Sequence, residues 1–241
     1  MKTSTSLLQL SLAISLCVIS LEAQIPANSL CSTGLTPKSP TPGGCTTSVL
    51  VNPINPVDGG PITDGNWELA TPYPSASIGE EAPNPCTSAL TYAPAPVSAP
   101  NSGWYNPDDG LSQWISPNGG DLPPGWYVYR TAFTVPPAYE TYTNFDLELN
   151  GQMMADDRVG AIYIADLAGA STTCHPIGAY VNPDQYEAWK PFSVGASVLP
   201  ATGGFLYFII YNAGTTTPNP TGLRVEFTSA TYYPYTPDGA N

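Results

Sequence analysis

The stretch FDLELNGQMMADDRVGAIYIAD, residues 145–166, alternates apolar and polar side chains in its first half and is mostly apolar in its second. One face of the first half carries Phe145, Leu147, Leu149 and Met153, and the other carries Asp146, Glu148, Asn150 and Gln152. Successive side chains of a β-strand point to opposite faces, so this pattern predicts a strand with one face in the core and one in water. The second half predicts a further strand over residues 159–166.

Other stretches repeat this behaviour. In GLRVEFTSATY, residues 222–232, the inward face has Leu223, Val225 and Phe227, and the opposite face has Arg224, Glu226 and Thr228. The segment FLYFIIY, residues 205–211, is apolar on both faces, which predicts a central strand covered on both sides. Further strands are expected at residues 67–70, 126–135 and 189–194. No stretch has helical spacing over three turns, and 28 prolines and 22 glycines punctuate the chain. We therefore predict an all-β fold, an antiparallel β-sandwich.

The first residues have the pattern of an export signal. Lys2 is followed by an uncharged apolar stretch from Leu7 to Leu21 and then by Glu22, Ala23 and Gln24. This predicts a secretory signal peptide over residues 1–23. No later segment approaches the roughly 20 apolar residues that a membrane span requires. We expect a secreted or cell-surface protein without a membrane span.

The remaining chain divides by composition. Residues 24–63 are rich in proline and glycine and predict an irregular N-terminal arm. Residues 64–233 hold the predicted strands of one β-sandwich domain, and residues 234–241 form a C-terminal tail. A second proline-rich stretch, residues 82–100, predicts a long surface loop. A chain of 241 residues, 42% of them hydrophobic, is long enough to bury one sizeable core.

The charge of the chain excludes one class of partner. Without residues 1–23 the chain keeps 5 basic and 18 acidic side chains, a net charge of −13. Binding a nucleic acid needs a basic patch that displaces counterions, and five scattered cations do not supply one. An anionic membrane surface is disfavoured for the same reason.

Four cysteines follow the predicted signal peptide, at Cys31, Cys45, Cys86 and Cys174. An even count in an exported chain predicts two disulfides, for which three connectivities exist. We favour Cys31 with Cys45, because they flank a Pro/Gly-rich loop, and Cys86 with Cys174. A zinc site is disfavoured, since the chain has no C-x-x-C motif and one histidine, His175.

The order of several motifs resembles a known family. The succession DGNWELATP, SQWISP, YVYRTAFTVP, LELNGQMMADDRVGAIYIAD, WKPFSVG, FIIYNAG and TGLRVEFTSATY is similar to the galactose-binding-domain-like jelly-roll modules of exported bacterial surface proteins. The resemblance covers roughly residues 64–233. It implies a sandwich of about eight strands that binds carbohydrate or serves in adhesion, commonly with a structural calcium ion, and that is not catalytic.

The adjacent Asp156 and Asp157 are candidate site residues. Neighbours on a strand point to opposite faces, and a buried carboxylate needs a partner. We predict a structural charge pair of Asp157 with Arg224, or with Arg130 as the second choice, while Asp156 points the other way.

Calcium coordination is the alternative role for these aspartates. Calcium takes six to eight oxygen ligands, which loops rich in Asp and Asn provide. The stretches NPDDG, residues 106–110, and NPDQYE, residues 182–187, are such loops, although each is also an ordinary turn sequence. Asp156 and Asp184 are the candidate metal ligands.

Aromatic side chains near loops are candidates for sugar binding. Sugar rings stack their apolar faces on aromatic rings, and their hydroxyls hydrogen-bond planar polar groups. The candidate ligand-binding residues are Trp104, Tyr105, Asp108, Asp109 and Asn212. Trp114 and Trp126 are predicted to be buried, as tryptophans in β-sandwiches usually are.

Support for catalysis is weak. A serine triad needs a histidine beside the nucleophile, and His175 precedes a proline in a chain without a G-x-S-x-G motif. Paired carboxylates for glycoside cleavage stay open, because their separation is a property of the fold.

We therefore predict an exported noncatalytic module that binds carbohydrate or mediates adhesion at the cell surface or in the extracellular matrix. The alternative is a structural subunit of a surface layer, filament or sheath, which forms a homo-oligomer or polymer by strand addition through its arm and tail. A glycoside hydrolase is the third hypothesis.

Overall fold

The computed structural model describes residues 30–33, 63–71, 82–87, 89–106, 111–117, 121–133, 144–166, 174–178, 186–200, 203–213 and 219–234. The predicted signal peptide, most of the arm and most of the tail lie outside these residues. Within the described part the chain forms β-strands and no α-helix, and it contains no helix long and apolar enough to cross a membrane. The predicted all-β class is confirmed.

The strands form two main sheets and one small one. They are β1 (Thr63–Thr71), β2 (Thr91–Pro96), β3 (Asp121–Leu122), β4 (Gly125–Phe133), β5 (Asn144–Asp156), β6 (Arg158–Asp166), β7 (His175–Gly178), β8 (Lys190–Pro200), β9 (Gly204–Asn212), β10 (Asn219–Pro220) and β11 (Gly222–Pro234). A six-stranded sheet has the order β2-β1-β4-β9-β6-β7, and a three-stranded sheet has the order β11-β5-β8. Strands β3 and β10 pair with each other and form the small two-stranded sheet. All of these pairings are antiparallel.

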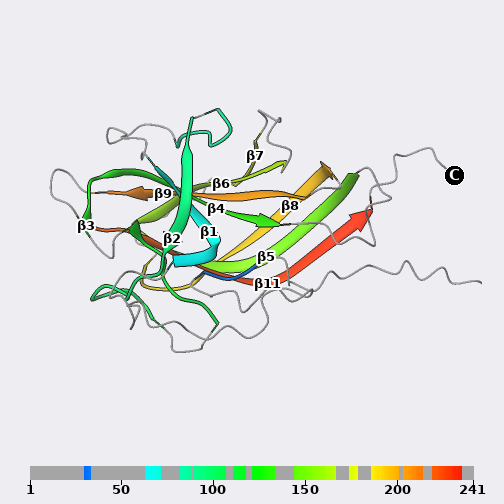
Figure 1. Ribbon diagram of the computed structural model, residues 1–241. Coiled ribbons are helices and arrows are strands. Elements are labelled where there is room, and N and C mark those ends of the chain that lie inside the picture. Colours follow the sequence, from blue (N-terminus) through cyan, green and yellow to red (C-terminus); the bar gives the residue numbers. More distant parts are fainter. Residues whose placement is uncertain are drawn as a thin grey trace, which may run out of the picture.

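The connections between the two main sheets give a jelly roll. From β4 to β11 the chain alternates between the two main sheets, with two exceptions: β6 and β7 are neighbours in the same sheet, and β10 belongs to the small sheet. Figure 1 shows β5, β8 and β11 side by side as one layer and β4, β6 and β9 as the other. Jelly rolls are built this way, as double sheets with Greek-key connections. The predicted antiparallel β-sandwich is therefore confirmed.

The free edge of β11 is covered by two short segments of chain. The backbone N–H of Thr33 donates to Val225 at 3.1 Å, and Ile115 and Leu223 exchange two backbone hydrogen bonds of 2.9 Å. The indole N–H of Trp67 donates to the carbonyl of Cys31 at 2.8 Å. Part of the predicted arm thus belongs to the sandwich, and it satisfies backbone groups that an open sheet edge would leave exposed.

Alternating side chains build the core between the sheets. Leu147, Leu149 and Met153 of β5 are buried there, as predicted, together with Leu223 and Val225 of β11. The core also holds the aromatic rings of Trp67, Phe192 and Phe208.

Strand β9 is buried on both faces, as its sequence predicts. It lies between β4 and β6, with Leu206, Phe208 and Ile210 in the inter-sheet core. Tyr207, Ile209 and Tyr211 belong to a second buried cluster on the outer face of the six-stranded sheet.

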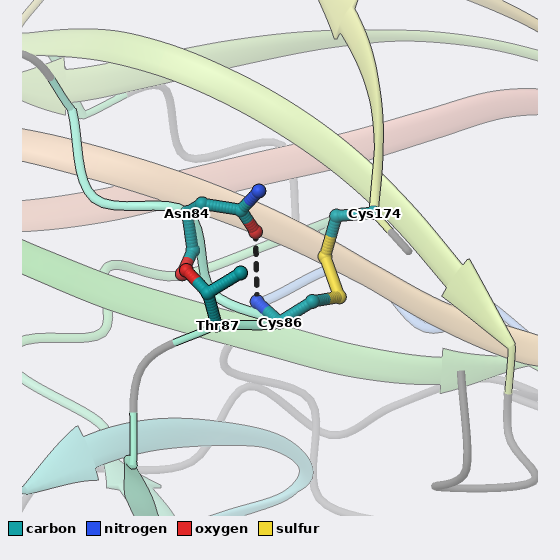
Figure 2. Close-up of a disulfide and its surroundings, with 4 residues drawn as sticks. All are labelled: Asn84, Cys86, Thr87 and Cys174. Atoms are coloured by element: carbon teal, nitrogen blue, oxygen red, sulfur yellow. Dashed lines mark hydrogen bonds between the residues drawn. A yellow bond between two sulfur atoms is a disulfide. The ribbon is translucent and has the colours of Figure 1, made fainter. Parts of the chain in front are cut away.

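A disulfide joins two segments over this outer face. Cys86 and Cys174 are bonded, with 5.6 Å between their Cα atoms and a sequence separation of 88. Figure 2 shows the bond, with the Asn84 side-chain oxygen accepting a hydrogen bond of 3.0 Å from the N–H of Cys86. This pairing was predicted and is confirmed. Cys31 is also disulfide-bonded, and its predicted partner, Cys45, lies outside the described residues.

The proline-rich stretch at residues 82–100 differs from the prediction. It was expected to be a surface loop, but residues 91–96 form β2, which pairs with β1. Strand β2 lies at the edge of its sheet. Edge strands tolerate proline because one side of the strand needs no ladder hydrogen bonds, and β2 contains Pro94 and Pro96.

Candidate functional site

The outer face of the three-stranded sheet is polar. The inward side of β5 is buried in the core, so its alternate residues Glu148, Asn150 and Gln152 face outward. By register Gln152 lies opposite Glu226 of β11, and Asn150 lies opposite Ser193 of β8. Amides, hydroxyls and carboxylates therefore form rows across the three strands.

A shallow depression lies in this face. Its volume is about 570 Å³, within the usual range of ligand sites. The lining residues come from all three strands and are Asn150, Gly151, Gln152, Pro191, Phe192, Ser193 and Thr228.

Gly151 is required at the centre of this depression. A Cβ atom there would lie 2.5 Å from the backbone oxygen of Glu226 and 2.6 Å from Cζ of Phe192, well inside contact distance. The glycine therefore lets the Phe192 ring pack directly on β5 below the polar side chains.

Aromatic loops cover one end of the same face. Trp104 and Trp114 are buried with Met154 of β5, and Tyr186 and Trp189 pack against them while partly exposed. The centroids of Trp104 and Trp114 are 4.2 Å apart. The loops are tied together by a hydrogen bond of 2.9 Å from the N–H of Tyr105 to the carbonyl of Tyr186. The polar outer face of the three-stranded sheet and the aromatic loops therefore lie next to each other.

A buried polar network lies beneath these loops. Arg224 is fully buried, and its Nε donates to Ser112 Oγ at 2.6 Å while its Nη1 donates to Asn106 Oδ1 at 2.9 Å. Its guanidinium also lies 5.1 Å from the ring centroid of Trp189. Ser112 in turn donates to Glu226 Oε1 at 2.7 Å, which lies 3.7 Å from Nη2 of Arg224.

The predicted charge pair of Asp157 needs correction. Among the described residues, Arg224 is paired with Glu226 and Arg130 with Glu68, the latter at 2.6 Å, and neither is paired with Asp157. The physical reason is register. Glu226 lies two residues from Arg224 on the same face of β11, and Glu68 of β1 lies opposite Arg130 of β4.

Asp157 instead bonds the residue that follows β9 and the first residue of β10. Its Oδ2 accepts a hydrogen bond from the backbone N–H of Ala213 and one of 3.5 Å from Asn219 Nδ2. Asp156 is buried and accepts a hydrogen bond of 2.5 Å from the indole N–H of Trp104. Each carboxylate therefore holds a connecting segment to the sandwich.

Three of the predicted ligand residues, Trp104, Tyr105 and Asn212, lie in the described part of the chain. Trp104 is buried, whereas Tyr105 is 45% exposed. Asn212 is fully buried and donates to the carbonyls of Leu122 and Pro123 at 3.0 and 3.2 Å, so its observed contacts are structural.

The other predicted loop aspartates fall outside the described residues. These are Asp108, Asp109 and Asp184. Within the described part, no cluster of three His, Cys, Asp or Glu side chains is placed to hold a metal ion. Calcium binding therefore stays a prediction.

Arg130 forms a separate cluster on the outer face of the six-stranded sheet. Its guanidinium lies 3.6 Å from the ring centroid of Tyr92 and 4.3 Å from that of Phe205. Burial raises the pKa of Tyr92 above its ordinary value. Burial also raises the pKa of Tyr207, against the opposing influence of Arg130. These phenols are therefore neutral at physiological pH.

Sequence reasoning missed the lining of the depression. Asn150 and Gln152 were placed on the wet face of their strand, but nothing in the local pattern marked them as site residues. Gly151 is the one available signal, because a glycine inside a strand often marks a close approach of other groups.

Comparisons with known proteins add little. No family model matches the chain, and no curated protein does. Among solved structures, the CBM22-1 xylan-binding domain of Paenibacillus barcinonensis Xyn10C matches with 12% sequence identity and a TM-score of 0.28, over 51% of this chain and 87% of that domain. This likeness is too distant to indicate the ligand of the present chain. The jelly-roll fold implied by the sequence resemblance follows from the strand topology, and the family itself stays a prediction.

Proposed function

We propose that this protein is an exported, noncatalytic module that binds carbohydrate on the outer face of its three-stranded sheet. The observation that supports this most is the depression of about 570 Å³, in which the amides of Asn150 and Gln152 and the hydroxyls of Ser193 and Thr228 adjoin the apolar Pro191 and Phe192. Sugars present many hydroxyls, each able to donate and accept. The amide oxygens of Asn150 and Gln152 can accept from them, and the hydroxyls of Ser193 and Thr228 match both roles. The glycan lies across the three strands.

The aromatic end of the face supports the same proposal. Trp189 and Tyr186 are partly exposed beside Lys190 and Pro191, where β8 begins. Aromatic rings offer flat apolar surfaces that complement the apolar faces of sugar rings. The Arg224 guanidinium packs on the Trp189 ring, 5.1 Å from its centroid. A ring restrained in this way loses less entropy when it binds a ligand.

Export is supported by the disulfide chemistry. A bond between Cys86 and Cys174 forms and persists in oxidising compartments, outside the reducing cytosol. The predicted signal peptide agrees with this location. An exported binding module meets its glycan at a cell surface or in an extracellular matrix.

A glycan array with a matched pair of variants tests the proposal. Thr228 lines the depression, and Thr87 is also exposed but lies beside the disulfide over the other sheet. We expect wild-type protein to bind at least one glycan class and Thr228→Ala to lose about 2- to 10-fold in affinity, the loss of one net hydrogen bond. Thr87→Ala should bind like the wild type. Equal losses for both variants, or no glycan bound by the wild type, would contradict the proposed site.

A further inference from the structure

The two amides of the depression turn their donors toward the protein. Asn150 Nδ2 donates to Ser229 Oγ at 3.1 Å and to Glu148 Oε1 at 3.4 Å, which uses both of its N–H groups. Gln152 Nε2 donates to Glu226 Oε2 at 2.6 Å. The carbonyl oxygens of both amides are therefore directed away from these partners. The face presents mainly acceptors to a ligand.

Among the described residues, the solvent-accessible charges of this face are negative. Glu148 is exposed on the outward side of β5, two residues before Asn150. Asp146, two residues before Glu148, lies on the same side. None of the residues that line the depression is basic. Among nearby described cations, Arg224 is fully buried, and Lys190 lies opposite Met153 in register, on the other side of the sheet.

A ligand that donates hydrogen bonds and carries positive charge complements such a surface. A protonated amino group has three N–H donors and a positive charge, whereas a carboxylate or sulfate has acceptors only and would be repelled. Hydroxyls satisfy acceptors but gain nothing from the negative charge. The chemistry of the face therefore favours glycans with amino groups over neutral glycans, and neutral glycans over acidic ones.

Within the proposed glycan-binding function, on which this inference rests, we propose that the face selects glycans with free amino groups, such as polymers of glucosamine. Neutral glycans bind more weakly, and acidic glycans bind least. The residue that sets this order is Glu148, at the margin of the depression. Exposed ion pairs are weak, so we expect about a 2- to 5-fold preference for the amino form over its N-acetylated counterpart at low salt.

The test is calorimetric titration of the full exported chain with four oligosaccharides of equal length. They are a glucosamine oligomer, its N-acetylated form, a cello-oligosaccharide and an oligogalacturonate. The matched variants are Glu148→Gln and Glu68→Gln, since the Glu68 side chain is also solvent-accessible but lies on the six-stranded sheet, beside Arg130. We expect Glu148→Gln to abolish the preference for the amino form without weakening neutral binding, and Glu68→Gln to keep it.

The outcomes separate the inference from the proposed function. Neutral oligomers that bind as well as the amino form would overturn the inference and leave the proposed function standing. Equal losses of preference in both variants would also overturn it, because the attraction would then come from the overall charge of −13. Absence of binding by all four oligosaccharides would count against the proposed function itself.

Discussion

We expect the replacement of Glu226 by glutamine to destabilise the sandwich. Glu226 is 4% exposed and accepts hydrogen bonds from Ser112 and Gln152 while facing the fully buried Arg224. In Glu226→Gln the side chain that faces the buried Arg224 loses its negative charge, and one of its two acceptor oxygens becomes an NH2 donor.

The magnitude follows from these contacts. Removing one member of a buried ion pair costs about 3 to 5 kcal/mol, because the other charge stays buried. The lower end applies here, since Arg224 keeps its hydrogen bonds to Ser112 and Asn106 and lies 3.7 Å from Glu226. We expect a loss of about 3 kcal/mol in the free energy of unfolding. For a chain of this size that corresponds to about 6 to 12 °C in Tm.

Glu148→Gln is the matched control. It makes the same chemical change on the same face of the sheet, at an exposed carboxylate with one hydrogen bond of 3.4 Å. Exposed charges of this kind contribute about 0 to 1 kcal/mol. Thermal and denaturant unfolding of both variants measures the difference. If Glu226→Gln and Glu148→Gln unfold alike, the buried network does not stabilise the fold as argued.

Four further predictions concern stability. Gly160→Ala should lower the free energy of unfolding by about 1 to 3 kcal/mol, because a Cβ at Gly160 would collide with the Trp126 ring. A Cβ at Gly195 meets open space, so Gly195→Ala should leave the free energy of unfolding unchanged or raise it by about 0.5 kcal/mol. Equal effects of the two variants in chemical denaturation would contradict the described packing. Replacing both cysteines of the Cys86–Cys174 bond by serine should cost about 4 to 5 kcal/mol for an 88-residue separation, and an unchanged denaturation midpoint would refute this. Burial raises the pKa of Tyr92, so its phenol stays neutral in the folded protein but ionises near pH 10 in the unfolded chain. The free energy of unfolding should therefore fall as the pH rises above about 10. In alkaline titrations of stability, Tyr92→Phe should reduce that fall. Excess calcium should raise Tm relative to chelator by mass action, and identical melting curves would remove calcium from the account.

Much of the fold was predictable because each strand carries its own signal. The alternation in residues 145–153 places Leu147 and Leu149 in the core, and the two-sided apolar pattern of residues 205–211 places β9 at the centre of a sheet. These patterns need only the two-residue period of a strand. They do not say which distant loop covers an outer face.

The site was less predictable for that reason. The sequence put Arg224 and Glu226 on the face opposite the core, but folding covers this face with loops near Trp104 and Trp114, more than 100 residues earlier in the chain. Two charges of opposite sign at positions i and i+2 of a strand share one face. That spacing was a local clue to the observed pair, whereas the depression around Gly151 depends on three strands and had no local signal beyond the glycine.

The central claim is that glycan binds on the outer face of the three-stranded sheet. NMR titration with a glycan that the protein binds tests this claim most directly, because it locates the ligand on the molecule. The claim predicts the largest amide shift changes at the outer face of the three-stranded sheet, at Gly151, Ser193 and Thr228. Amides near Arg130, on the outer face of the six-stranded sheet, should not shift. Shifts confined to the six-stranded sheet, or to the loops at Asp157 and Asn212 alone, would contradict the proposed binding face.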